Sequence, residues 1–212
     1  MKNKFYQIYM FSLLSIFAFS SCDDSDEPEI VELEVQTAED IPANPDGANG
    51  APPSYTFYDL DEGIILAKSD SNSTKWDLAF SKTTILTNSG VSGPGNGGAM
   101  IVEGIFEDIK TVPETGFNTD TEESLAIPTG SENGWYTYTG PTGSPAHAIL
   151  PIPGKVIMVK TGDGKYAKVE ILSIYEGNPD TSTSEFEDLA TRATYGYYTF
   201  RYVVQTEANT SF

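Results

Sequence analysis

Side chains that could act on a substrate or ligate a metal are scarce in this sequence. The chain has one histidine, His147, and one cysteine, Cys22, which lies near the N-terminus. Cysteine–histidine catalysis and histidine-clustered zinc both need more such side chains, so the composition excludes them. A Ser/His/Asp arrangement on His147 stays open, but no Gly-x-Ser-x-Gly element marks a nucleophile. We expect a protein that is not an enzyme.

Haem iron is a metal centre for which the sequence does offer ligands. The candidate axial ligands are His147, Met158 and Met100. His147 lies in the loop Gly-Pro-Thr-Gly-Ser-Pro-Ala-His-Ala, which can reach a ligand or can leave the ring in solvent. Met100 and Met158 lie inside short apolar runs, where methionine also serves as a core side chain.

Three aromatic residues, Trp135, Tyr136 and Tyr138, precede that loop. In an extended strand Trp135 faces one side while Tyr136 and Tyr138 face the other, so we expect one aromatic face in the core. Rings on an exposed face could stack on a sugar or a porphyrin, which makes all three candidates for ligand stacking. Core packing is the alternative for each ring.

Two other patterns offer weaker chemistry. The run Gly93-Pro-Gly-Asn-Gly-Gly98 is similar to a phosphate-binding loop, but a strand-like run follows it and no lysine closes it. We therefore expect a sharp turn there. Asp59, Asp61 and Glu62 carry oxygen ligands for calcium but lack the EF-hand spacing, so we expect exposed turn residues.

The elements that must position these residues are short strands. From residue 54 onward, runs rich in aromatic and β-branched residues alternate with Gly, Asn, Asp and Pro. We expect strands at 55–60, 63–68, 75–87, 98–104, 135–139, 156–161, 166–175 and 197–205. The turn Gly162-Asp163-Gly164 predicts an antiparallel hairpin, and only 184–193 favours a helix, of one to three turns. The pattern predicts a single antiparallel all-β domain of a sandwich or open-barrel kind, with little helix.

The N-terminal region has a different composition. Residues 1–21 join two lysines to an apolar run too short for a final membrane span and predict a lipoprotein signal peptide. Small residues precede Cys22, as in a lipobox, so we expect Cys22 to be lipidated. We expect an acidic, Pro/Gly-rich tether at 22–54, with an edge strand at 31–35, and an all-β ligand-binding domain at 55–212.

The net charge of the chain is -19. A chain this acidic repels nucleic-acid phosphates and anionic membrane surfaces. We therefore expect no nucleic-acid partner, and contact with a membrane through the lipid anchor only.

Several motifs occur together in a fixed order across residues 55–205. They are Lys75-Trp-Asp-Leu-Ala-Phe80, Ser92-Gly-Pro-Gly-Asn-Gly-Gly-Ala99, Thr111-Val-Pro113, Gly134-Trp135, the run 156–160 followed by Asp163-Gly164 and Ala167-Lys168-Val169, and Tyr198-Thr-Phe-Arg-Tyr202. This ordered set resembles the HmuY-type haem-binding lipoproteins of Bacteroidota. The resemblance implies an HmuY-like all-β fold and a lipoprotein on the outer-membrane cell surface. It also implies a role in iron acquisition, in which haem is bound and passed to an outer-membrane transporter.

The resemblance also indicates where haem ligands would lie. Characterised members hold haem between two axial His or Met side chains, one from the segment between the Thr-Val-Pro and Gly-Trp motifs. Here that segment, 114–133, contains neither residue type. The second ligand follows the Gly-Trp motif by about five residues, where this chain has Gly140. His147 lies further along the same loop and could substitute if the loop folds back.

Two functions follow as expectations. The first is non-catalytic binding of haem or another porphyrin for uptake, with His147 as the best axial candidate. The alternative is the same fold with the haem site lost, binding a glycan or a protein partner through its aromatic loops.

Overall fold

The computed structural model describes residues 33–43, 54–205, 211 and 212, which belong to one compact unit of the chain. The predicted signal peptide at 1–21 and Cys22 lie outside the described residues. Among the described residues, no helix has the length and apolar character needed to cross a membrane.

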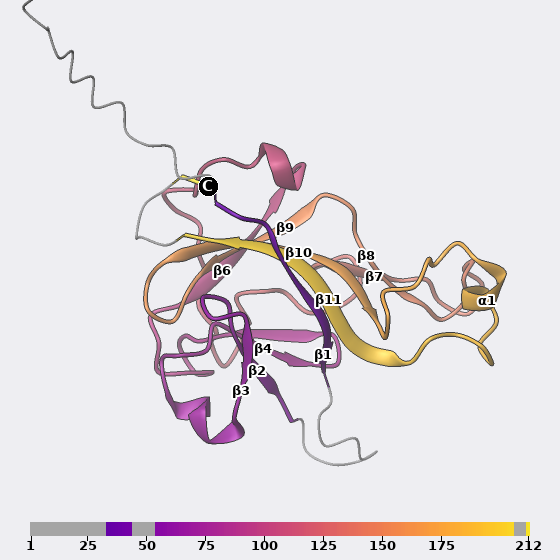
Figure 1. Ribbon diagram of the computed structural model, residues 1–212, viewed down its shortest axis with the longest axis horizontal. Helices are drawn as coiled ribbons and strands as arrows, with labels where there is room; N and C mark the ends of the chain where they lie inside the picture. The colour runs from indigo at the N-terminus through magenta and orange to yellow at the C-terminus, as the bar shows by residue number, and fades with distance from the viewer. Residues whose placement is uncertain (1–32, 44–53, 206–210) are drawn as a thin grey trace, which may run out of the picture. The chain divides into compact units, whose positions relative to one another are not determined.

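The larger of two main sheets has five antiparallel strands in the order β1-β11-β10-β9-β6. Its strands are β1 (Gln36–Pro42), β11 (Tyr195–Val204), β10 (Tyr166–Tyr175), β9 (Lys155–Lys160) and β6 (Gly98–Glu103). The predicted hairpin is confirmed, because β9 pairs with β10 from Tyr166↔Lys160 to Val169↔Ile157 across the Gly-Asp-Gly turn. Figure 1 shows β10 and β11 as the long strands of this sheet.

The second sheet has four antiparallel strands in the order β3-β2-β4-β5. They are β3 (Ile64–Leu66), β2 (Thr56–Asp59), β4 (Leu78–Ser81) and β5 (Thr84–Thr87). The single strand predicted at 75–87 is therefore two strands. The chain reverses at Lys82, whose φ of 51° allows the tight turn between them.

Aromatic side chains join the two sheets into one core. Phe80 of β4 stacks on Phe200 of β11, with ring centroids 5.5 Å apart, and lies 4.7 Å from the Tyr198 ring. Tyr58 of β2 meets Phe200 edge-on at 5.3 Å. These rings are almost entirely buried. The period-two pattern of β11 predicted this inward face, and the sheets pack as expected for an all-β sandwich.

The five-stranded sheet is covered on its other face as well. Ile157 and Val159 of β9 belong to the main core, whereas Val156 and Met158 alternate into a second cluster with Phe106. Two short 3-10 helices lie in connecting segments, η1 at Lys68–Asn72 and η2 at Phe106–Asp108. β9 is thus a strand buried on both faces, which explains its nearly continuous apolar sequence.

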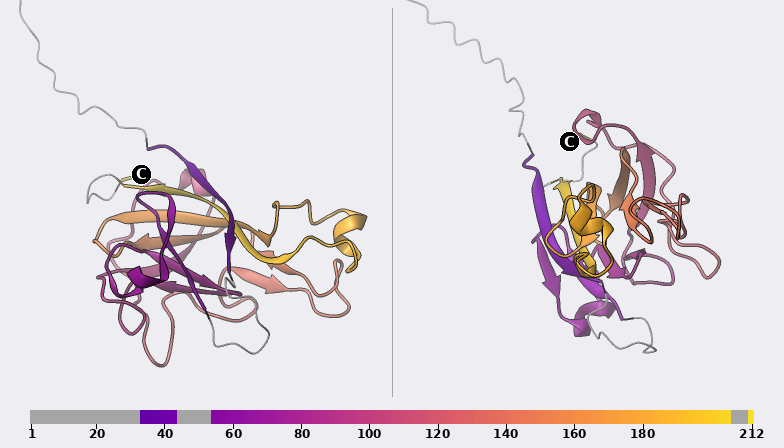
Figure 2. Two further views of the ribbon diagram at one scale, coloured as in Figure 1. Left: turned by 60° about the horizontal axis from the view of Figure 1, so that its bottom comes forward. Right: turned by 90° about the vertical axis from the view of Figure 1, so that its right-hand side faces the viewer.

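A two-stranded sheet, β7 (Tyr136–Tyr138) with β8 (Ile149–Pro151), carries the loop that contains the histidine. The only α-helix among the described residues is α1 (Ser184–Glu187), in the segment where a short helix was predicted. Ser144 Oγ in the β7–β8 loop donates to Glu187 Oε1 at 2.8 Å. The loop and α1 therefore lie together beyond the ends of β10 and β11, as the right of Figure 1 and the left view of Figure 2 show.

The predicted tether at 22–54 and its edge strand at 31–35 need correction only at residues 33–43 and 54, because 22–32 and 44–53 lie outside the described residues. Residues 33–35 are not a strand, and β1 begins just after them and pairs with β11 from Gln36↔Tyr202 to Pro42↔Tyr197. Its sequence is polar, but Ala38 and Ile41 are buried against the core. Pairing with β11 is thus what makes this polar segment a strand. The folded region begins well before residue 55.

Candidate functional site

The β7–β8 loop folds back on itself and brings the histidine beside Gly140. The backbone N–H of His147 donates to Gly140 O at 2.8 Å. Thr139 Oγ1 donates to Pro145 O at 2.6 Å and accepts the N–H of Ala148 at 2.9 Å, which holds the loop in this shape. The single histidine therefore reaches the neighbourhood of the position where the motif pattern has Gly140.

The imidazole of His147 is oriented by a tyrosine of the neighbouring strand. Tyr138 Oη lies 2.6 Å from His147 Nδ1, and the two ring centroids are 6.1 Å apart. Both side chains are exposed. With Nδ1 engaged in this hydrogen bond, Nε2 is the nitrogen left to meet a ligand.

His147 lines a cavity of about 520 Å³, here called the His147 cavity. Its walls combine apolar, aromatic and one cationic side chain, and the lining residues are His147, Ile149, Tyr175, Leu189, Arg192, Ala193, Thr194 and Tyr195. These come from the β7–β8 loop, β8, the end of β10, the segment after α1 and the start of β11. A cavity of this size and lining is suited to a small organic molecule.

Arg192 is fixed by carbonyl oxygens instead of a carboxylate. Its Nε donates to Phe186 O at 2.7 Å, and its terminal nitrogens donate to Glu187 O at 3.2 Å and His147 O at 3.3 Å. The guanidinium also lies 4.7 Å above the Phe186 ring. Within the described part of the chain Arg192 forms no ion pair, so its charge stays available to an anionic group in the cavity.

Two tyrosines form the inner wall of the His147 cavity. Tyr175 is 3% exposed, and its Oη accepts the N–H of Ile149 at 3.0 Å, which ties β10 to β8. The Tyr195 ring lies 6.0 Å from that of Tyr175. Partial burial, with smaller effects from Tyr175 and Tyr136, raises the pKa of Tyr195 to about 12. Tyr195 is therefore a neutral phenol at physiological pH.

These residues fit one side of a haem. His147 offers Nε2 as an axial nitrogen, the apolar and aromatic walls can cover a flat ring, and Arg192 can pair with a carboxylate. His147 is the sole His, Met or Cys among the residues that line this cavity. Apart from the phenols of Tyr175 and Tyr195, His147 is therefore the one side chain in this lining of a type that ligates haem iron.

The two candidate methionines lie elsewhere. Met158 is fully buried in the second core cluster, which corrects its assignment as a candidate ligand. Met100 pairs across the sheet with Met158 and lines a separate cavity of about 320 Å³ beside the segment 114–133. Neither sulfur belongs to the His147 cavity.

The burial of the three aromatic residues before the loop differs from the expected alternation, which placed Tyr136 and Tyr138 on one face and Trp135 on the other. Trp135 and Tyr136 are 2% and 7% exposed, and Trp135 Nε1 donates to Thr83 O at 3.2 Å. Both rings are core residues, so their assignment as stacking candidates was wrong. Tyr138 is 44% exposed and is the ring of the three that a ligand can reach.

The segment 114–133 is pinned by a buried aspartate that the sequence analysis did not single out. Asp120 is 1% exposed, and its carboxylate accepts the N–H groups of Thr87 at 3.0 Å and Ala126 at 2.8 Å. Its own N–H donates to Ser89 Oγ at 3.0 Å. The segment is therefore fixed against β5 by these hydrogen bonds.

The acidic residues considered for calcium serve the fold. Of the three, Glu62 is exposed as expected, whereas Asp59 and Asp61 lie beside Asp77, and the carboxylate oxygens of these three aspartates are within 4.8 Å of one another. Asp77 Oδ2 accepts the N–H of Leu60 at 2.8 Å and Oδ1 that of Gly162 at 2.9 Å, while Asp61 pairs with Lys165 at 3.0 Å. Asp59 is buried, which corrects the expectation of an exposed turn residue. These contacts satisfy the carboxylates of Asp77 and Asp61.

The glycine-rich run is a turn, as predicted. Asn88 Oδ1 accepts the N–H of Gly95 at 2.8 Å, and Asn88 O accepts that of Gly97 at 3.0 Å. A Cβ on Gly95 or Gly97 would lie 2.6 or 2.8 Å from Asn88 O, so only glycine fits. The strand β6 follows directly, which leaves no helix for a phosphate site.

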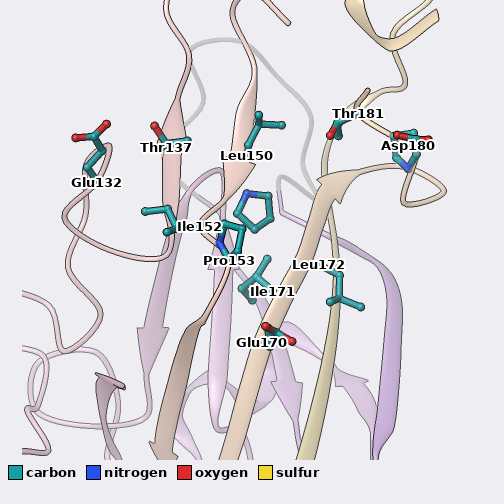
Figure 3. A pocket seen from close by; sticks show the side chains of 12 residues that line it. Glu132, Thr137, Leu150, Ile152, Pro153, Glu170, Ile171, Leu172, Asp180 and Thr181 are labelled. Carbon is teal, nitrogen blue, oxygen red and sulfur yellow. The ribbon is translucent and has the colours of Figure 1, made fainter. Parts of the chain in front are cut away.

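A second and larger cavity, of about 930 Å³, lies between β8 and the C-terminal half of β10 and is here called the β8–β10 cavity (Figure 3). Its lining residues are Glu132, Thr137, Leu150, Pro151, Ile152, Pro153, Glu170, Ile171, Leu172, Pro179, Asp180 and Thr181. None of these is a His, Met, Cys or aromatic residue. Neither this cavity nor the part that Arg192, Leu189 and Tyr195 play in the His147 cavity could be predicted from the sequence, because no local pattern marks residues that tertiary folding brings together.

Comparison with known proteins identifies the protein family of the chain. Residues 52–202 match the family model described as HmuY protein. The chain belongs to the HmuY family. No curated protein matches it significantly.

Two solved structures with HmuY-like folds are similar to this chain at 15% identity. The apo HmuY analogue TFO of Tannerella forsythia aligns with a TM-score of 0.51 over 83% of this chain and 97% of its own. Apo PinO of Porphyromonas gingivitis aligns with a TM-score of 0.52 over 83% and 100%. At this identity the likeness establishes the HmuY-like fold, and the predicted family and fold class are both confirmed.

The family motifs lie mainly in the framework of the HmuY fold. Trp76 is fully buried and donates to Ser71 O at 2.9 Å, and the neighbouring Asp77 bonds the turn at Gly162. Trp135 and Tyr198 meet in the core at 5.3 Å. The ordered motif set therefore identifies the fold, whereas the residues of the His147 cavity lie outside these motifs.

Proposed function

We propose that this HmuY-family protein binds haem or a closely related porphyrin without catalysing a reaction, with His147 as the protein's one axial ligand. The observation that carries the proposal is the folded-back loop, which sets His147 against Gly140 through a 2.8 Å backbone hydrogen bond. Family membership supplies the class of ligand, and the loop supplies a ligating nitrogen near the position that the family pattern uses.

A bound haem would bring an iron that accepts an axial imidazole nitrogen, a flat apolar ring and two carboxylates. The Tyr138 hydroxyl holds Nδ1 of His147 and so aims Nε2 at the cavity. Ile149 and Leu189 exclude water from one face of the ligand, and Arg192 attracts a carboxylate.

The setting of this activity is also part of the proposal. A lipid on Cys22 would anchor the protein at the outer membrane, and the acidic residues after it support display on the cell surface. The ligand would then be passed to an outer-membrane transporter. The net charge of -19 keeps the protein away from nucleic acid and anionic lipid, which leaves the anchor as the contact with the membrane.

Titration of the purified protein with haemin, followed by the Soret band, tests the proposal. We expect saturable binding with a red-shifted band in the wild type, and affinity at least tenfold weaker in His147→Ala because the axial bond is lost. Met100→Leu is the matched control, because Met100 lines a different cavity, and it should bind as the wild type does. A Soret band of unchanged position and affinity in His147→Ala would overturn the assignment.

The alternative function, a family member whose haem site has been lost, has an observation of its own. The segment 114–133 contains no His or Met, and the lining of the His147 cavity contains no second His, Met or Cys. A glycan would have to stack on Tyr138, because Trp135 and Tyr136 are buried. Absence of any haemin-dependent band, together with glycan-array binding that Tyr138→Ala abolishes, would favour this alternative.

A further inference from the structure

The β8–β10 cavity has the chemistry of a peptide site and not of a cofactor site. Leu150, Ile152 and Pro153 form one wall and Ile171 forms the other, as Figure 3 shows. Its lining offers no His, Met, Cys or Tyr side chain to serve as an axial ligand of haem, and no aromatic ring on which a sugar could stack. The apolar walls need an apolar occupant, and the His147 cavity does not share any of these residues.

One wall of this cavity is an unpaired strand edge. The ladder between β9 and β10 ends at Val169↔Ile157, but β10 continues to Tyr175. Within the described residues it pairs there with β11 alone, regularly as far as Ile171 and with register shifts after Ile171 and after Ser173. Tyr166 O accepts the N–H of Gln205 on the β11 side, and backbone groups alternate along a strand. The N–H and C=O of Ile171 therefore point away from β11, toward the cavity.

The opposite wall cannot close this edge. Pro151 and Pro153 lie there and have no N–H to donate, so the segment that follows β8 is unable to form a regular ladder with β10. A strand edge left open beside an apolar cavity is the geometry in which an extended peptide adds to a sheet.

Carboxylates flank the apolar walls. Glu132 and Asp180 lie on opposite sides of the cavity in Figure 3. Hydrogen bonds from the side chain and the backbone N–H of Ser182 lower the pKa of Asp180, so it is ionised at neutral pH. Glu170 is already paired with Arg201, whose Nε lies 2.6 Å away. The two flanking carboxylates therefore select positive charge.

Charge also discriminates between occupants. A second copy of this chain carries the same net charge of -19, and the run Cys22-Asp-Asp-Ser-Asp-Glu-Pro-Glu29 of its own N-terminal region is acidic. Both would be repelled by Glu132 and Asp180. A basic segment from another protein is complementary.

We propose that the β8–β10 cavity receives an extended, basic segment of a partner protein, which adds as a strand to the free edge of β10 at Ile171. Backbone hydrogen bonds provide the pairing, apolar side chains of the segment contact Leu150 and Ile152, and basic side chains reach Glu132 and Asp180. This inference is independent of haem binding, because it uses none of the residues of the His147 cavity.

Fluorescence polarisation with synthetic probes tests the inference on the purified full-length protein. The probe is a labelled nine-residue peptide of alternating valine and lysine, and its comparators are the valine–glutamate peptide and a valine–lysine peptide with N-methylated valines. We expect binding of the first peptide only, with an affinity at least tenfold weaker after N-methylation because the strand hydrogen bonds are lost. The double substitution Glu132→Gln/Asp180→Asn should weaken binding several-fold.

The matched control is Glu122→Gln/Glu123→Gln, which removes two exposed carboxylates outside the cavity lining. It should leave the affinity unchanged. Equal binding of the N-methylated peptide would overturn strand addition, and equal losses in both double variants would reduce the effect to general charge attraction. Haemin titration of the Glu132→Gln/Asp180→Asn protein should match the wild type, so the two proposals succeed or fail separately.

Discussion

The backbone N–H of His147 donates to the carbonyl oxygen of Gly140 at 2.8 Å, seven residues earlier in the same loop. The bond closes the loop so that its last residues return to β7, where Tyr138 meets the imidazole. His147 itself has a φ of 54°, a conformation that histidine adopts more readily than most residues with a Cβ. Loop shape therefore determines where the ring lies.

Thr139→Val tests this dependence on loop shape. The valine keeps the branched side chain but removes the hydroxyl that bonds Pro145 O and the Ala148 N–H. We expect haemin affinity to fall about tenfold, because His147 loses its fixed position, and the free energy of unfolding to fall by about 1 kcal/mol. Haemin titration and urea unfolding measure the two effects. Unchanged haemin affinity in a folded variant would show that haemin binding does not depend on the conformation of this loop.

Tyr138→Phe tests the orientation of the imidazole. The ring remains, but the 2.6 Å contact of its hydroxyl with Nδ1 is lost. Partners that orient a metal-ligating histidine typically contribute 10–100-fold to affinity, so we expect a loss of about tenfold and a shifted Soret band. Tyr195→Phe, which removes a hydroxyl from the lining of the His147 cavity, is the control. A larger loss of haemin affinity in Tyr195→Phe than in Tyr138→Phe would show that the Tyr195 hydroxyl, and not that of Tyr138, matters more for binding.

Arg192→Gln tests recognition of carboxylates. Removing the charge should weaken binding of haemin, whereas haemin dimethyl ester, which lacks free carboxylates, should bind the wild type and the variant alike. We expect a difference of about tenfold between the two ligands in the wild type, and a much smaller one in the variant. If the substitution lowers the affinity for both ligands equally, the cause is the loss of the Arg192 hydrogen bonds to the carbonyl oxygens of Phe186, Glu187 and His147.

Asp77→Asn tests a titration in the framework. Burial raises the pKa of Asp77 from 3.8 to about 7, against the lowering effect of the N–H groups of Leu60 and Gly162. Between these values the folded chain keeps a proton that the unfolded chain releases, so the contribution of Asp77 to stability falls as pH rises from about 4 to about 7. Asparagine does not titrate.

Urea unfolding of both proteins at several pH values measures this effect. Asparagine can accept only one of the two N–H groups, and we expect the variant to be about 1–3 kcal/mol less stable. The difference between the two proteins should narrow as pH rises through the window. A difference that stays constant or widens would contradict the raised pKa.

Gly97→Ala tests the tight turn between β5 and β6. Its Cβ would lie 2.8 Å from Asn88 O and 3.0 Å from Lys160 O, both backbone atoms that cannot move alone. We expect a loss of about 1–3 kcal/mol in the free energy of unfolding. Gly104→Ala is the matched control, because its Cβ would meet Ile109 at an ordinary 3.6 Å. Similar unfolding curves for both variants would show that the close contact of the Cβ at position 97 does not destabilise the fold.

The sequence was most informative where local pattern and burial coincide. β9 and β10 could be predicted because two apolar runs flank a Gly-Asp-Gly turn, and β11 because its alternation matches the buried aromatic face. β1 could not, because a polar heptapeptide becomes a strand only through pairing with a distant part of the chain.

The same limit applies to the candidate site. His147 stood out as the single histidine in a loop, and the structure gives it a cavity. Arg192 lies 45 residues further on and reaches the His147 carbonyl only through the fold. Trp135, which precedes β7, and Tyr136, which begins it, are both buried in the main core, and a period-two rule cannot detect that consecutive side chains are both buried.

The carboxylate of Asp77 also has a consequence for how the fold opens. One oxygen holds the N–H of Leu60, at the β2–β3 turn of the four-stranded sheet, and the other holds the N–H of Gly162, at the β9–β10 turn of the five-stranded sheet. If either turn moves away, the buried carboxyl group of Asp77 loses one of its two hydrogen-bond donors. Amide hydrogen exchange at Leu60 and Gly162 should therefore occur through the same opening event, with equal protection at two sites about a hundred residues apart.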